Sequence, residues 1–140
     1  MIITILTILL AVLFPQLSRA ATLVVACSGK VTTRFSPSFA DTEMKRNVGD
    51  LSIVINFDRK AVSGFWVNDN GYVWLPITTA DAYSVSFEAT RKYLGNDNHI
   101  SGIIDRVTGV ASVDDITNYK EGGPLPRSSY ETWHLHCKVD

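Results

Sequence analysis

The chain has 140 residues, with 13 basic and 14 acidic side chains that give a formal charge of -1. It carries no run of Lys and Arg, whereas a protein that grips nucleic-acid phosphates needs a clustered positive footprint. Composition therefore excludes a dedicated nucleic-acid-binding protein.

An apolar run from Ile2 to Phe14 opens the sequence and is followed by Pro15 and then by Ser18-Arg19-Ala20. This layout is typical of a secretory signal peptide, with small residues at the two positions that signal peptidase reads. The apolar run of about 13 residues is too short for a membrane-spanning helix, which needs ~20. We expect residues 1–20 to be removed and residues 21–140 to form a single β domain. The mature protein would be periplasmic or secreted, with no membrane span.

Segments rich in Val, Ile, Thr, Phe and Tyr recur between turn residues along the mature chain, without strong helical periodicity. Asn70-Gly71 is a strong hairpin signal because both positions tolerate a positive φ. A polar connection is expected over 36–48, and a loose linker that contains Pro124 and Pro126 over 115–128. The predicted strands are 23–35, 51–57, 61–67, 72–77, 83–90, 100–105, 110–114 and 129–139.

The two cysteines, Cys27 and Cys137, lie on the first and last predicted strands. An exported protein meets oxidising conditions, so an even pair predicts one disulfide. Val24-Val25-Ala26-Cys27 is alternatively a loose lipobox, in which Cys27 would be a lipidated N-terminus. Pro15 and Arg19 interrupt the apolar run that should lead into such a cysteine, which favours the disulfide.

About eight short strands fit either an up-and-down barrel or a two-sheet sandwich. Successive hairpins favour a meander, and a bond between the first and last strands would bring the two ends of that meander together. We therefore predict an all-β antiparallel meander that forms a small barrel, with a two-sheet sandwich as the alternative.

Four segments also resemble a group of small exported β-rich hypothetical proteins of rhizobial (alphaproteobacterial) type. They are 51–65, Leu75-Pro76-Ile77-Thr78-Thr79-Ala80-Asp81-Ala82, Ser101-Gly102-Ile103-Ile104-Asp105-Arg106-Val107-Thr108-Gly109 and Leu135-His136-Cys137. The resemblance spans nearly the whole mature chain. It implies export and a β fold, and it implies no activity because none is assigned to the group.

The histidines are the strongest metal candidates, because His134 and His136 lie two apart on one strand face and His99 is a possible third ligand. Zinc requires three or four convergent ligands, and the sequence places no third one beside the pair. A nucleophile elbow and a phosphate-binding glycine loop are both missing from the sequence. We therefore expect no metal, no cofactor and no enzymatic activity.

The hairpin around Asn70-Gly71 is apolar on both faces, although a strand pair with one wet side should alternate apolar and polar residues. One face is predicted to carry Phe65, Val67, Tyr72 and Trp74, and the other to carry Trp66, Val73, Leu75 and Ile77. The second set makes the better core, whereas Tyr and Trp suit a boundary with water. The first face is therefore our candidate binding surface, unless the linker or the start of the mature chain covers it.

The predicted function is an exported non-enzymatic binding module whose ligand is unknown. Barrels of about eight strands can hold one small ligand, so a small apolar molecule in the barrel mouth is the first expectation. A protein-interaction or inhibitor-like envelope accessory protein is the second reading, and an enzyme without a recognisable motif is the third.

Overall fold

The computed structural model describes residues 22–36, 43–120 and 128–139, which form ten β strands. The strands are β1 (Thr22–Ser36), β2 (Met44–Asn56), β3 (Ala61–Ser63), β4 (Val67–Asn68), β5 (Gly71–Tyr72), β6 (Leu75–Ala80), β7 (Ser84–Tyr93), β8 (Asn96–Asp105), β9 (Val110–Asn118) and β10 (Ser128–Val139). In these ranges no helix has the length and hydrophobicity needed to cross a bilayer. The predicted signal peptide, 1–20, and the two linker prolines lie outside the described residues.

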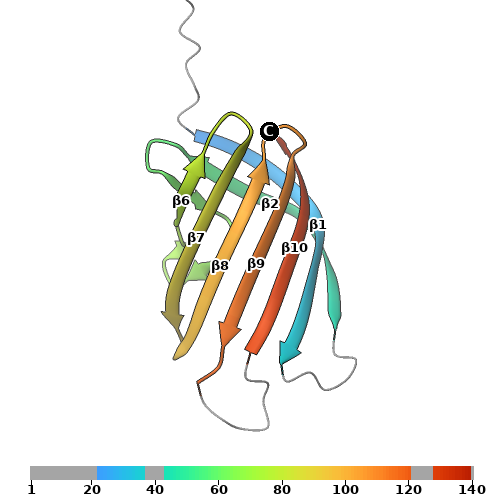
Figure 1. Ribbon diagram of the computed structural model, residues 1–140, viewed down its shortest axis with the longest axis vertical. Helices are drawn as coiled ribbons and strands as arrows, with labels where there is room; N and C mark the ends of the chain where they lie inside the picture. The colour runs from blue at the N-terminus through green and yellow to red at the C-terminus, as the bar shows by residue number, and fades with distance from the viewer. Residues whose placement is uncertain (1–21, 37–42, 121–127, 140) are drawn as a thin grey trace, which may run out of the picture.

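Eight of the strands close into an antiparallel barrel in the order β1-β10-β9-β8-β7-β6-β3-β2. Strands that follow one another along the chain are paired, except that β3 pairs with β6 and leaves β4 and β5 as a separate hairpin. β1 pairs with β10 over most of its length and completes the ring. Figure 1 shows this wall of tilted strands, with the short β4–β5 hairpin beside it. The predicted meander barrel is thus confirmed, and the sandwich alternative is wrong.

The predicted strand 61–67 is interrupted, and this changes what the following residues do. Strand β3 ends at Ser63, and Gly64 adopts a φ of +127°, a conformation that side-chain-bearing residues rarely adopt. A Cβ at Gly64 would come within 2.6 Å of the Ser52 carbonyl oxygen. Glycine therefore lets the chain turn tightly past β2, and Phe65 and Trp66 enter the barrel.

Several strands are longer than predicted at one end of the barrel. β2 begins at Met44 inside the predicted polar connection, β8 begins at Asn96 inside a predicted loop, and β9 continues to Asn118 inside the predicted linker. These extensions place polar residues such as Arg46 and Asn98 on the inner face, so they lack a continuous apolar alternation by which strands are recognised.

The hydrophobic core fills the opposite end and the middle of the barrel. Side chains from all eight wall strands contribute, and the largest fully buried ones are Phe87, Ile53, Ile55, Leu75, Ile100 and Leu135. Protein interiors of this kind are close-packed. The cavity that the structure shows lies toward the other end of the barrel.

Cys27 and Cys137 are directly paired residues on β1 and β10 and form a disulfide with a Cα–Cα distance of 4.0 Å. This confirms the predicted bond. It lies across the seam where the first and last strands meet, and it is consistent with a protein that folds in an oxidising compartment.

Candidate functional site

The inside of the barrel changes from apolar to charged toward the end where β1 finishes and β10 begins. Residues directly paired across antiparallel strands point to the same face of the sheet. Buried Val31 pairs with Arg46 and with Trp133, so Arg46 lies on the inner face of β2. Thr33 pairs with Glu131, which by the same reasoning lies on the inner face of β10.

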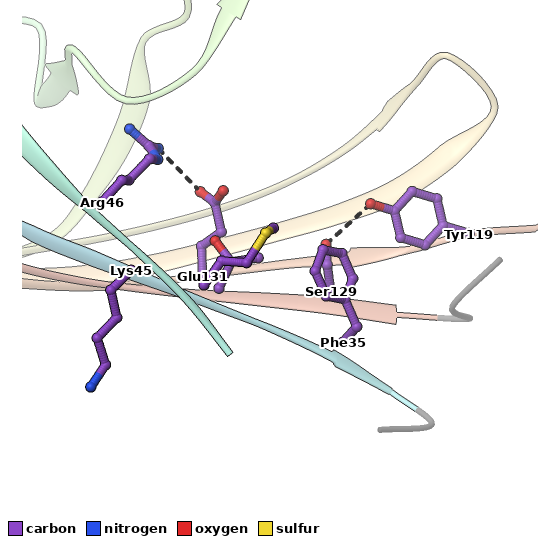
Figure 2. A pocket seen from close by; sticks show the side chains of 8 residues that line it. Phe35, Lys45, Arg46, Tyr119, Ser129 and Glu131 are labelled. Carbon is purple, nitrogen blue, oxygen red and sulfur yellow. Dashed lines mark hydrogen bonds and ion pairs between the residues drawn. The ribbon is translucent and has the colours of Figure 1, made fainter. Parts of the chain in front are cut away.

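A cavity of about 420 Å³ lies at this end of the barrel, between β1, β2, β10 and the residues just after β9. Figure 2 shows its lining side chains. They are Thr33, Phe35, Met44, Lys45, Arg46, Tyr119, Ser129 and Glu131. Small-molecule sites have volumes of ~300 to 1,000 Å³ and combine apolar surface with a few polar groups, as this cavity does.

The charged groups of the cavity are only loosely paired. Arg46 Nη2 lies 4.0 Å from Glu131 Oε2, and the Arg46 guanidinium stands 5.3 Å from the centre of the Trp133 ring. Beside them Tyr119 Oη and Ser129 Oγ are 3.2 Å apart, as Figure 2 shows. Since the Arg46 side chain is 54% exposed and Glu131 is 31% exposed, both retain hydrogen-bonding capacity for another molecule.

A second polar cluster lies where the chain crosses the barrel after β3. Trp66 Nε1 donates a 2.7 Å hydrogen bond to Asp115 Oδ2. The Arg91 guanidinium packs over the Trp66 ring at 4.2 Å and over the Tyr93 ring at 4.5 Å, and its Nη1 donates to the Val67 carbonyl oxygen. The crossing segment is thus fixed by both charged groups.

Burial raises the pKa of the Asp115 carboxyl above its ordinary value. The hydrogen bond from Trp66 works in the opposite direction, the negative charge of Glu131 raises the pKa further, and the positive charge of Arg91 lowers it. The Asp115 carboxyl therefore holds its proton to a higher pH than an exposed aspartate does.

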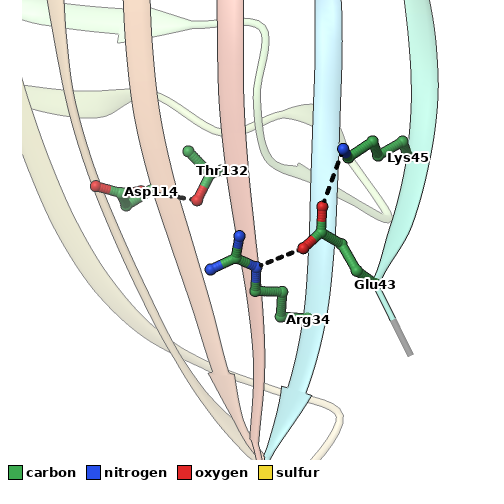
Figure 3. A network of polar contacts seen from close by, with 5 residues as sticks. All are labelled: Arg34, Glu43, Lys45, Asp114 and Thr132. Carbon is green, nitrogen blue, oxygen red and sulfur yellow. Dashed lines mark hydrogen bonds and ion pairs between the residues drawn. The ribbon is translucent and has the colours of Figure 1, made fainter. Parts of the chain in front are cut away.

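The outer wall carries a separate polar network, drawn in Figure 3. Glu43 lies between Arg34 Nε at 3.1 Å and Lys45 Nζ at 3.2 Å, and Thr132 donates to Asp114 across β9 and β10. The hydrogen bond from Lys45 lowers the pKa of the exposed Glu43. Lys45 therefore contributes to the cavity rim while its ammonium group is held on the outside.

The four residues predicted to form one binding surface lie in three different environments. Phe65 is only 8% exposed, and its ring stacks on Phe87 with a centroid distance of 5.2 Å. Trp74 is half-buried beneath the Arg59 guanidinium, whereas Val67 and Tyr72 are 51% and 59% exposed. The inward turn at Gly64 separates Phe65 from the others, so the predicted common exposed face does not form. Whether Val67 and Tyr72 bind a partner stays a prediction.

The histidines are distributed as the alternation along the last strand suggests. His134 and His136 are exposed on the outside of β10, with ring centroids 5.8 Å apart. His99 instead contacts Glu88 at 2.8 Å on the β7–β8 pair. Within the part of the chain that the structure describes, no three potential ligands gather into a metal-binding group.

The residues of the cavity were not singled out by the sequence. Glu131 could have been found, because it continues the period-two series of Trp133 and Leu135 whose side chains are buried. Arg46 had no such signal, since it lies in a segment whose composition predicts a loop. The same holds for Asp115 of the second polar cluster.

Comparison with protein-family models, with curated proteins and with solved structures finds no match to this chain.

Proposed function

We propose that this protein is an exported, non-enzymatic binding module that holds a small molecule at the charged end of its barrel. The observation that carries the proposal is the cavity of about 420 Å³, lined by inward-facing Arg46 and Glu131 together with aromatic side chains.

Arg46 and Glu131 point inward but add little to the stability of the fold. Both side chains are partly exposed and keep part of their hydration, and a contact of 4.0 Å between them is worth little. Their charged groups are therefore free to bind another molecule, which favours a role in recognising a ligand.

The side chains that line the cavity also change the first expectation, which was a small apolar ligand. Phe35, Met44 and Tyr119 offer apolar and aromatic contact, while Arg46 and Glu131 offer hydrogen bonds of both kinds. An amphipathic molecule, with an apolar part and a polar edge, fits this combination better than a hydrocarbon.

Export to the periplasm or the extracellular space is part of the proposal. The signal-peptide pattern of residues 1–20 and the Cys27–Cys137 disulfide both favour it. The resemblance to small exported rhizobial proteins is consistent with the same compartment.

Native mass spectrometry of the protein purified from its own cells tests the proposal. We expect an additional mass of a retained small molecule, which should then rebind about tenfold more weakly to Glu131→Gln than to the wild type. Glu88→Gln is the matched control, because Glu88 lies on the outside and contacts His99. Detection of the bare polypeptide mass alone, or equal weakening by both substitutions, would contradict the proposed site.

A protein-interaction role is the second candidate, favoured by the exposure of Val67 and Tyr72 on the β4–β5 hairpin. Exposed apolar and aromatic residues on a protruding hairpin are suited to contact with another protein. The substitution Tyr72→Ala should then abolish co-purification of a defined partner without changing stability, and unchanged co-purification would exclude this surface.

A further inference from the structure

We infer that the cavity binds a free α-amino acid with an apolar side chain, whose carboxylate contacts Arg46 and whose ammonium group contacts Glu131. Such a ligand would occupy the site of the proposed binding function, on which the inference rests. Two side chains of opposite charge line this one cavity, and both are accessible to solvent.

Arg46 and Glu131 offer opposite charges at a place that a molecule from solution can reach. Arg46 Nη2 and Glu131 Oε2 are 4.0 Å apart, and Figure 2 shows the two side chains pointing toward one another. Strong charge-assisted hydrogen bonds are ~2.7 to 2.9 Å long, so the two groups do not form one with each other. A ligand with a single charge could satisfy one of them and would leave the other without a partner. A ligand that carries both charges can bind each group.

The 4.0 Å spacing of the pair favours a ligand whose own two charges are close together. In an α-amino acid the nitrogen and the carboxyl carbon are bonded to the same Cα by bonds of ~1.5 Å, which places the nitrogen within about 3 Å of a carboxylate oxygen. The carboxylate can therefore accept a hydrogen bond from Arg46 while the ammonium group donates one to Glu131. The charged ends of a peptide are at least one further residue apart, ~3.8 Å, and suit this spacing less well.

Hydroxyl groups beside Glu131 complete the acceptors that an ammonium group needs. Thr33 is directly paired with Glu131, and Ser129 lies two residues before Glu131 on the same face of β10. Both residues line the cavity, although they are only 9% and 7% exposed. An ammonium group has three donors and no acceptor, and one carboxylate with two hydroxyl groups offers an acceptor for each donor. The nitrogen of the ligand is therefore placed at Glu131.

Arg46 is the basic group that remains for the carboxylate of the ligand. Lys45 also lines the cavity, but its Nζ lies 3.2 Å from Glu43 on the outer wall, and Figure 2 shows Lys45 directed away from Arg46. The Arg46 guanidinium stands 5.3 Å from the centre of the Trp133 ring. A guanidinium that stacks on a ring keeps the N–H groups of its edge, whose fork matches the two oxygens of a carboxylate.

The other lining side chains favour an apolar side chain on the ligand. Phe35, Met44 and Tyr119 line the same cavity as the charged pair, and its volume of about 420 Å³ is in the range of small-molecule sites. An aliphatic or aromatic side chain would remove their apolar surface from water, whereas glycine would leave it uncovered. The site thus favours amino acids such as leucine and phenylalanine over small or charged ones.

Isothermal titration calorimetry with matched probes tests this inference. L-Phenylalanine and L-leucine carry both charges and an apolar side chain. Among the other probes, 3-phenylpropionate lacks the ammonium group, phenethylamine lacks the carboxylate and glycine lacks the side chain. We expect phenylalanine or leucine to bind at least tenfold more tightly than these three. This ranking on the wild type requires no substitution and decides the ligand class by itself.

Two substitutions test the orientation of the ligand. Glu131→Gln should weaken phenylalanine binding about tenfold and remove its preference over 3-phenylpropionate. Arg46→Gln should weaken it to a similar extent and remove its preference over phenethylamine. Arg34→Gln and Glu88→Gln are the matched controls, because Arg34 contacts Glu43 and Glu88 contacts His99 on the outer wall. Both controls should bind phenylalanine as the wild type does.

The outcomes separate the ligand class from the proposed function. If another probe binds as tightly as the two amino acids, or if no probe binds, the ligand class is wrong; the proposed function still stands where native mass spectrometry shows a retained molecule that Glu131→Gln loses. Equal binding of phenylalanine by the wild type, Glu131→Gln and Arg46→Gln would place the amino acid outside this cavity and overturn the inference. Failure of every probe, together with a bare polypeptide mass from its own cells, would overturn both.

Discussion

The double substitution Cys27→Ala/Cys137→Ala should produce a folded barrel that is markedly less stable. The bond closes a segment with a sequence separation of 110 residues. In the chain-entropy account, a loop of that length restricts the unfolded chain by about 5 kcal/mol at 25 °C, which native strain and residual unfolded-state structure reduce. Because β1 and β10 stay hydrogen-bonded on both sides of the bond, the folded ring itself does not require it. We expect a loss of about 3 to 5 kcal/mol.

Equilibrium urea unfolding followed by tryptophan fluorescence measures this loss. Wild-type protein with a reduced bond is the informative control, because it lacks the cross-link but retains the sulfur of Cys27, which is 1% exposed in the core. Both forms should also show a steeper dependence on urea, since an unfolded chain without the cross-link exposes more surface. A loss below about 1 kcal/mol in both forms would refute the reasoning from loop closure.

Three further outcomes are expected from single substitutions. Phe65→Ala should lower the unfolding free energy by about 3 to 5 kcal/mol because its ring is buried. Tyr72→Ala, on the surface, should change the unfolding free energy by less than about 0.5 kcal/mol. Equal losses for the two variants in urea unfolding would place Phe65 outside the core. Because the pKa of Asp115 is raised in the folded state, the folded protein binds its proton more readily than the unfolded chain does, and the unfolding free energy should fall as pH rises above ~4. Asp115→Asn should remove this fall and be the more stable form at pH 7. Unfolding measured from pH 3 to 8 checks both expectations. Gly29→Ala should destabilise the barrel because a Cβ there would overlap the backbone of β10, and Gly49→Ala, whose Cβ meets no atom within 4 Å, should unfold like the wild type in a thermal melt.

The wall of the barrel was predictable from the sequence because most of its strands alternate visibly between buried and exposed residues. Turn residues such as Asn70-Gly71 marked the connections between strands. The two cysteines lie on the first and last predicted strands, and this position indicated that the sheet closes into a barrel. What the pattern did not reveal is how far β2, β8 and β9 continue. Those extensions have polar inner residues, so a rule that equates the inner face with apolar side chains reads them as loops.

The inner site was hidden for the same physical reason. Arg46 and Asp115 lie inward because their paired neighbours do, and pairing between distant strands is not visible in one sequence. The parity of the hairpin correctly grouped Trp66 with Leu75 as core, but it placed Phe65 outside. That assignment assumed a continuous strand, whereas the chain leaves the wall at Gly64.

The barrel interior is apolar at one end and polar at the other, so folding stability and the proposed binding function depend on different residues. Changes around Ile53, Ile55 and Leu135 would alter folding, whereas changes around Arg46 and Glu131 would alter the ligand preference of the proposed site. The charged end could therefore acquire new preferences, by natural drift or by laboratory selection, while the disulfide and the apolar end keep the scaffold intact.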